Sequence, residues 1–124
     1  VFNNCGAVYY NLGNYPKAVD YLRQAATIQE EIGDKKVTAI ITENIGGIYS
    51  KVKDYTNAMK YNNKAFSIFK EINDERGIAK ILLETGHILM EQGNLEKALE
   101  NFNQSLTTAI KIKDKQFEIE VLSS

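Results

Sequence analysis

Residues 15–34 read YPKAVDYLRQAATIQEEIGD, and residues 55–74, which lie 40 positions later, read YTNAMKYNNKAFSIFKEIND. Aligning residues 15–54 with residues 55–94 gives 12 identities in 40 positions. Unrelated sequences of ordinary composition would give about two or three. A third, more divergent copy keeps four residues in register, namely Leu95, Ala98, Ile112 and Asp114. The chain is therefore a tandem repeat with a period of 40 residues.

Each unit of the repeat contains two helical patterns. Apolar residues recur at spacings of three and four along residues 15–32 and again along residues 35–52, as on one face of a helix. No segment alternates with the period of a strand. The pattern predicts an all-α fold of about seven helices: the end of one, five complete helices at 15–32, 35–52, 55–72, 75–92 and 95–112, and the start of a seventh.

Turn and capping residues mark the joints between these helices. Gly13-Asn14, Lys53-Asp54 and Gly93-Asn94 lie at one kind of joint. The other kind is marked by Gly33-Asp34, Asn73-Asp74 and Lys113-Asp114, where we expect each aspartate to cap the next helix. The predicted organisation is a single array with units at 1–33, 34–73 and 74–113 and the start of another at 114–124.

Small residues recur at fixed places in the repeat. Ala18, Ala58 and Ala98 come early in the second helix of each pair, and Gly6, Gly46 and Gly86 lie within the first. A glycine inside a helix costs about 1 kcal/mol relative to alanine. Its recurrence in three copies predicts close packing between neighbouring helices.

Composition excludes several classes of function. The 124 residues carry a net charge of −1, which is a poor match for a nucleic-acid backbone, and no apolar run is long enough to span a membrane. One cysteine and one histidine leave little scope for metal or nucleophilic chemistry, and no phosphate-binding loop is present. We expect neither an enzyme nor a protein that binds a metal or a cofactor.

The ends of the sequence indicate a fragment of a longer protein. It begins at Val1, without an initiator methionine, and it stops within another periodic segment. The absence of a signal peptide in this sequence therefore gives no information about the cellular compartment. The single cysteine favours a reducing, cytoplasmic location, and the many lysine, isoleucine and asparagine residues favour a bacterial source.

Two motifs resemble the tetratricopeptide repeat. Asn-x-Gly-x-x-Tyr occurs at residues 4–9 and 44–49, and Gly-Asn-Tyr-x-x-Ala-x-x-Tyr-Leu-x-x-Ala occurs at residues 13–25. The 40-residue period departs from the usual 34-residue unit, the boundary proline is missing, and Asn62 replaces an aromatic residue. The resemblance implies a right-handed solenoid of antiparallel helix pairs, whose first helices line a concave groove that holds a peptide or a partner segment.

Carried over position by position, the resemblance assigns groove residues to the first helix of each unit. The candidate partner-binding residues are Asn3, Asn4, Tyr10, Asn11, Ile40, Glu43, Asn44, Ser50, Lys51, Lys80, Glu84, His87, Met90 and Glu91. Helical spacing independently places residues 40, 44, 47 and 51 on one face of the helix at 35–52. It likewise places residues 80, 84, 87 and 91 on one face of the helix at 75–92.

Asparagine is the most informative residue type in this set. Its amide has an acceptor and two donors, so Asn4 and Asn44 could pair with a peptide unit of any sequence. The alternative is that they cap a local turn or bond to a neighbouring helix. Glu84, His87 and Glu91 share a helix face, yet no second histidine is available to complete a metal site. Cys5 takes the place of Ile45 and is interpreted as a core residue.

Two functions follow from these observations. The first is a protein-interaction module that binds a peptide or an extended partner segment in its groove, as the sensor or scaffold part of a larger signalling or regulatory protein. The alternative is a structural spacer or self-association element that joins further copies through its exposed terminal helices.

Overall fold

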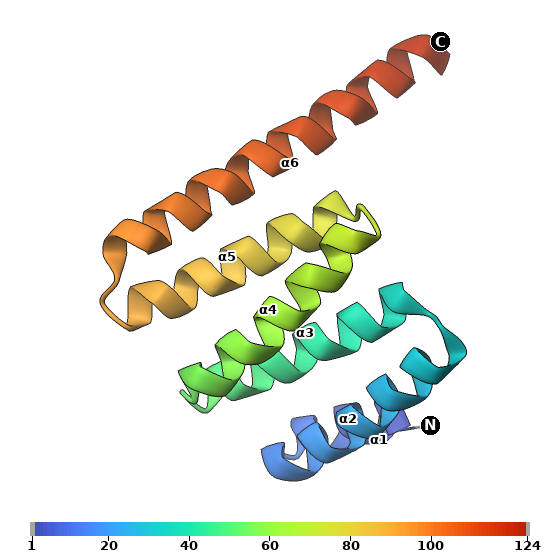
Figure 1. Ribbon diagram of the computed structural model, residues 1–124, viewed down its shortest axis with the longest axis vertical. Helices are drawn as coiled ribbons and strands as arrows, with labels where there is room; N and C mark the ends of the chain where they lie inside the picture. Colours follow the sequence, from blue (N-terminus) through green and yellow to red (C-terminus); the bar gives the residue numbers. More distant parts are fainter. Residues whose placement is uncertain (1, 124) are drawn as a thin grey trace. The chain divides into compact units, whose positions relative to one another are not determined.

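The computed structural model describes the backbone of residues 2–123 and the side chains of residue 6 and residues 8–113. This part of the chain forms helices throughout and contains no strand, which confirms the predicted all-α fold. Six helices are present, close to the predicted seven: α1 (Phe2–Asn11), α2 (Tyr15–Ile32), α3 (Lys35–Lys51), α4 (Tyr55–Glu71), α5 (Glu75–Glu91) and α6 (Leu95–Ser123) (Figure 1). None of the described helices is both long enough and apolar enough to cross a membrane.

Each joint between successive helices uses the same turn. A left-handed residue ends the helix, and the next N–H donates back to the carbonyl five residues earlier, as in Asp34 to Gln29 at 3.0 Å. The left-handed residues are Gly13, Gly33, Lys53, Asn73 and Gly93. The predicted caps are also confirmed, because the carboxylates of Asp34 and Asp74 accept the N–H of the third residue after them at 3.2 Å.

The boundary predicted at residues 113–114 is wrong, because α6 continues through it to Ser123. The same Lys-Asp pair does end α3, where Lys53 has a φ of 65°. A left-handed residue other than glycine costs about 1–2 kcal/mol. Close to this joint, α4 packs tightly against Gly46 of α3. Lysine and aspartate are therefore not sufficient to stop a helix, and the uninterrupted helix is favoured at 113–114.

The first compact unit, residues 1–68, contains α1, α2, α3 and most of α4. Helix α2 packs against both α1 and α3. Its buried face and that of α3 share one core, which consists of Ala18, Val19, Leu22, Ala25, Ala26, Ile41, Ile45 and Ile48. Ala18 and Ala58 are fully buried, as the repeat predicts. A Cβ on Gly6 would lie 2.9 Å from Cγ of Leu22, which confirms close helix packing there.

The second compact unit, residues 69–124, is built on the hairpin of α5 and α6. Ala98 of α6 is buried, and Gly86 of α5 faces the ring of Phe102, whose Cε1 would lie 2.7 Å from an added Cβ. Ser105 donates a hydrogen bond from its hydroxyl to the carbonyl of Ala79 at 2.8 Å. The glycine-mediated contact of the first unit therefore recurs here with a different partner side chain.

Candidate functional site

Helix α3 presents one open face and one buried face. Ile40, Asn44, Gly47 and Lys51 follow one another along the helix, and all four are exposed. The opposite stripe, which includes Ile41, Ile45 and Ile48, lies in the core shared with α2. The structure therefore confirms the helical arithmetic that separated these two faces.

Gly46 and Gly47 have opposite surroundings on α3. A Cβ on Gly46 would fall on the amide oxygen of Asn62, whereas a Cβ on Gly47 would meet no atom within 4 Å. Asn44, almost one turn before Gly47, is exposed, and its amide has no hydrogen-bond partner among the described residues. The surface of α3 at Gly47 is therefore open, and the exposed amide of Asn44 lies beside it.

Tyr10 and Lys51, two of the predicted groove residues, join α1 to α3. The ammonium of Lys51 donates to the hydroxyl of Tyr10 at 3.2 Å, and the same nitrogen lies 5.2 Å from the centre of the tyrosine ring. This hydrogen bond is the main cause that raises the pKa of Lys51 above its ordinary value. The pair forms one border of the open face.

Some predicted residues lie elsewhere. Glu43 is only 5% exposed, because α3 is covered on one side by α2 and on another by α4, so it does not belong to the open face. Ser50 is half-buried, and Asn11 is exposed near the end of α1. The side chains of Asn3, Asn4 and Cys5 lie outside the described residues.

In the second unit, α5 has a comparable open face. Ile81 and Ile88 are buried, whereas Lys80, His87, Met90 and Glu91 are exposed and Glu84 is half-buried. The imidazole of His87 approaches the ring of Phe102 edge-on, with 5.2 Å between ring centres. Within the described residues, no group of three His, Cys, Asp or Glu side chains has the arrangement of a metal site.

Arg23 of α2 makes a cluster that the sequence analysis missed. Its Nε donates to the hydroxyl of Tyr61 and its Nη2 to the hydroxyl of Tyr49, each at 3.1 Å. The two tyrosine rings are stacked at 5.6 Å. The bond to Tyr61, followed by the bond to Tyr49, raises the pKa of Arg23. The repeat period marked both tyrosines as core, and they do pack at its edge, but no pattern in the sequence pointed to Arg23.

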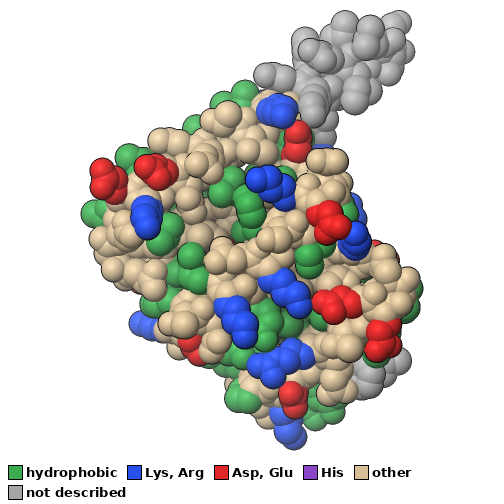
Figure 2. All heavy atoms as spheres, viewed as in Figure 1, with side chains coloured by type: hydrophobic (Ala, Val, Ile, Leu, Met, Phe, Trp, Pro, Cys, Tyr) green, Lys and Arg blue, Asp and Glu red, His purple; other side chains and the backbone are tan. Residues whose placement is uncertain are grey.

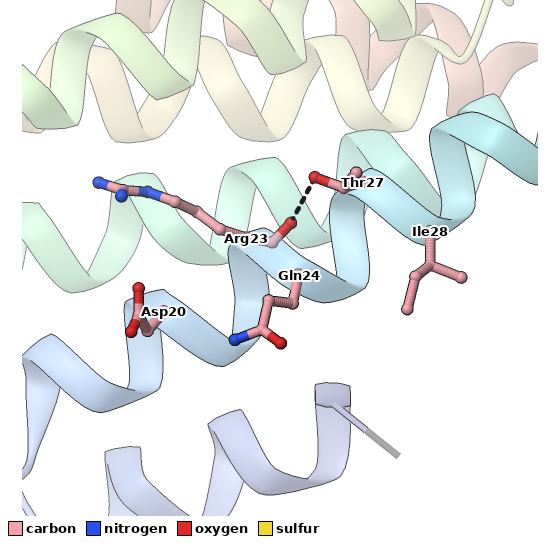
Figure 3. Close-up of a pocket in the computed structure, with 5 residues that line it drawn as sticks. All are labelled: Asp20, Arg23, Gln24, Thr27 and Ile28. Carbon is pink, nitrogen blue, oxygen red and sulfur yellow. Dashed lines mark hydrogen bonds between the residues drawn. The ribbon is translucent and has the colours of Figure 1, made fainter.

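A surface depression of about 450 Å³ lies along α2 and is lined by Asp20, Arg23, Gln24, Thr27 and Ile28. The volume would suit a small ligand. Figure 3 shows, however, that all five side chains come from a single helix and point in different directions. Such an open surface cannot surround a ligand, so the depression is a weaker candidate than the face of α3.

The two units differ in charge: residues 1–68 hold eight basic and six acidic residues, and residues 69–124 hold seven basic and ten acidic residues. On the face drawn in Figure 2, basic and acidic side chains are interspersed with apolar ones. Charges of both signs on this face agree with the net charge of −1 for the whole chain.

Solved structures with a similar fold come from several organisms. The chain matches BtubC from P. vanneervenii with a TM-score of 0.76 at 19% identity, over 86% of this chain and 44% of that one. It matches aspartyl phosphate phosphatase F from Bacillus subtilis with a TM-score of 0.85 at 19% identity, over 91% and 30%. It matches the TPR domain of Arabidopsis FLU with a TM-score of 0.80 at 17% identity, over 89% and 92%. The chain thus spans less than half of the first two proteins, and these identities establish the fold alone.

Comparison with family models gives the same result from the sequence. A search of curated proteins returned no match. One model of the tetratricopeptide repeat matches residues 1–71, and a second model of the same repeat matches residues 79–112. The first match covers more than half of the chain, and both fall on the helix pairs described above. The chain belongs to the tetratricopeptide repeat family, and its fold is that of a protein-interaction module.

Proposed function

We propose that the open face of α3, together with Tyr10 of α1, binds an extended segment of a partner protein. The observation that carries this proposal is the amide of Asn44, which is exposed and has no hydrogen-bond partner among the described residues. A side-chain amide offers one acceptor and two donors, so it can pair with the C=O and N–H of a peptide unit. Among the described residues Asn44 makes no hydrogen bond to a turn or to a neighbouring helix, which favours this role over the two alternatives for that residue.

Gly47 gives independent support. A glycine in the middle of an exposed helix costs about 1 kcal/mol relative to alanine. Gly46 has a packing reason, because Asn62 fills the space beside it, but Gly47 has none. Without a side chain at position 47, a bound backbone can approach α3 closely and reach the amide of Asn44.

The remaining groove residues would contribute side-chain contacts. In the first unit these are Asn11, Ile40, Ser50 and Lys51. The face of α5 in the second unit is a separate candidate surface, with Lys80, Glu84, His87, Met90 and Glu91. Burial removes Glu43 from the set, so Lys51 is the only charged residue of the predicted groove set exposed on α3. A ligand segment with a neutral or acidic character would suit the face of α3, whereas α5 offers both signs.

We also propose that this array serves as the sensor or scaffold part of a larger regulatory protein. The match covers 30% of aspartyl phosphate phosphatase F, so a stretch of this fold can belong to a longer chain. The full reading frame of the gene tests this point. A neighbouring kinase, phosphatase or DNA-binding domain supports it, and a reading frame that holds repeats alone favours the structural spacer.

Peptides selected from a phage-displayed library on the full chain provide a probe for the binding proposal. Asn44→Ala should weaken their binding about ten- to a hundredfold, since a paired peptide group loses both partners, at about 1–3 kcal/mol. The melting temperature should stay unchanged, because Asn44 is exposed and outside the core.

Asn63→Ala is the matched control, since Asn63 is an exposed asparagine of α4 outside the proposed face. It should leave both binding and melting unchanged. The proposal is wrong if Asn44→Ala lowers the melting temperature without changing affinity per folded molecule, or if the selected peptides bind both variants equally.

A further inference from the structure

Arg23 is held by two tyrosines that occupy only one edge of its guanidinium. Its Nε donates to the hydroxyl of Tyr61 and its Nη2 to the hydroxyl of Tyr49, so both bonds lie on the edge between Nε and Nη2. The five N–H donors of arginine form a planar fork, which has a second edge between Nη1 and Nη2. The described residues provide no polar partner for that second edge, and the side chain is exposed. A fixed pair of donors is therefore available to a ligand.

The positive charge at this place is not neutralised by a carboxylate. Both side-chain acceptors of Arg23 are neutral phenols, and Arg23 makes no ion pair within the described residues. Lys60 of α4 adds a second cation, with its ammonium 5.8 Å from the centre of the Tyr61 ring and no ion pair in the described part of the chain. Lys64 differs, because Glu30 pairs with it at 3.2 Å. Two cations therefore adjoin Tyr61 without a bonded counter-charge.

The tyrosine hydroxyls add further donors. Each accepts a hydrogen bond from Arg23, which leaves its own O–H to donate. Asp20, almost one turn earlier on α2, lines the same depression as Arg23, but the described residues show no bond between its carboxylate and the guanidinium. Figure 3 shows the Arg23 side chain extended to one side, away from Ile28. One carboxylate weakens the attraction of this place for an anion but does not cancel two cations.

We propose that Arg23, Lys60 and the hydroxyls of Tyr49 and Tyr61 bind a phosphate monoester, carried by a phosphorylated side chain of a partner protein or by a small phosphorylated compound. Such a group has a charge of about −1.5 to −2 near neutral pH and three acceptor oxygens, which match two cations and several donors. A carboxylate and a phosphodiester each carry a single charge and match less well. The fork of arginine fits two phosphate oxygens at once.

The arginine is not required by the packing of the repeat. Tyr9 and Tyr21, one period before the tyrosines that hold Arg23, are stacked in the same way at 5.3 Å, so the stack itself belongs to the repeat. Position 23 holds arginine in one copy only, because Asn63 and Asn103 take its place one and two periods later. A residue that served the packing of each unit would recur with the period.

This site is separate from the binding face proposed around Asn44. Five positions separate Asn44 from Tyr49 on α3, which turns the helix by about 140° between them. All residues of the site belong to the first compact unit, which is the more basic of the two. The phosphate site therefore does not depend on the peptide-binding function.

NMR signals of the arginine Nε–H groups test the proposal, because the chain has only two arginines, Arg23 and Arg76. Arg76 is also exposed, but it follows Asp74 and Glu75 and serves as the internal control. Titration of the 124-residue chain with a short glycine-flanked phosphoserine peptide should shift the Arg23 signal to saturation and leave the Arg76 signal in place. The same peptide with unmodified serine should shift neither signal.

Variants assign the binding to the fork and to the tyrosines that hold it. Arg23→Lys keeps the charge but loses the fork, so it should weaken phosphopeptide binding about ten- to a hundredfold, as expected for one lost charge-assisted hydrogen bond. The double variant Tyr49→Phe and Tyr61→Phe keeps both rings and should also weaken binding. Arg76→Lys is the matched control and should bind as the wild type does. Circular dichroism verifies that each variant remains folded.

Two further measurements distinguish the sources of the phosphate. An array of phosphoserine peptides with varied flanking residues should show a preference for particular flanks if the phosphate belongs to a partner protein. Uniform binding across the array, with inorganic phosphate an equally effective competitor, would assign the site to a small phosphorylated compound. The proposal is wrong if the Arg23 signal does not move, if both arginine signals move alike, or if Arg23→Lys binds as tightly as the wild type.

Discussion

The ring of Phe69 occupies the place where the Cβ of any larger residue at position 77 would stand. Gly77 lies in the first turn of α5, and Phe69 is 2% exposed. One period earlier the corresponding residues are Gln29 and Val37. The second unit thus has a larger side chain on α4, where Phe69 replaces Gln29, and no side chain on α5, where Gly77 replaces Val37. Glycine is needed at position 77 because Phe69 approaches closely, and not because of its backbone conformation.

Gly77→Ala should destabilise the protein by about 1–3 kcal/mol, because the buried ring of Phe69 has little room to move. Gly47→Ala is the matched control, since nothing lies near its Cβ and alanine is the better helix former. The control should stabilise the chain by about 0.4–1 kcal/mol. Urea denaturation measures both. Equal changes in the two variants would show that the Phe69 contact does not constrain position 77.

Asn62→Leu should raise the free energy of unfolding by about 1 kcal/mol. The amide oxygen of Asn62 is buried without a hydrogen-bond partner, and an unsatisfied buried group of this kind costs about 1–3 kcal/mol. Leucine already fills the equivalent place at Leu22, beside Gly6. Asn63→Leu, at an exposed neighbouring site, should have little effect. A lower unfolding midpoint for Asn62→Leu would mean that the amide is satisfied in solution.

Ala58→Leu should cost about 1–3 kcal/mol by overpacking. Ala58 is fully buried, and its carbonyl oxygen lies 3.4 Å from the position of a Cβ on Gly46. Ala109→Leu introduces the same change at an exposed site of α6 and serves as the control. Thermal melting should separate the two variants clearly. An unchanged midpoint for Ala58→Leu would contradict the close approach of α3 and α4.

Tyr10→Phe should lower the pKa of Lys51 towards its ordinary value of 10.5, because the phenol oxygen is the main group that raises it. The sign follows from linkage: a raised lysine pKa stabilises the folded state below pH 10.5, and this contribution is lost as the pH rises through the folded value. Titration of the lysine amine by NMR measures the shift. The control Tyr55→Phe should leave the pKa of Lys51 unchanged. An unchanged pKa of Lys51 in Tyr10→Phe would refute the contact between Tyr10 and Lys51.

Much of the fold follows from short-range signals. The 40-residue period identified the helix pairs, and the turn residues at Gly33-Asp34 and Asn73-Asp74 placed the boundaries within a residue. Boundary prediction failed at Lys113-Asp114, because the same Lys-Asp pair follows the end of α3 at Lys53-Asp54 and yet lies within α6 here, so the dipeptide alone does not decide whether a helix ends. The exposed face of α3 was also predictable, since residues 40, 44, 47 and 51 share one side of a helix whatever surrounds it.

The sequence by itself determined the family, the helical repeat, the caps and the need for small residues at positions such as Ala58, because these depend on spacing along one chain. Only the tertiary structure decided which side chains meet. Burial of Glu43 depends on helices that cover α3 from two sides, and the pairing of Arg23 with Tyr49 and Tyr61 joins three helices. Val8 and Ile48 share a place in the repeat, yet Val8 is 56% exposed and Ile48 is 4% exposed, because place in the repeat does not by itself decide burial.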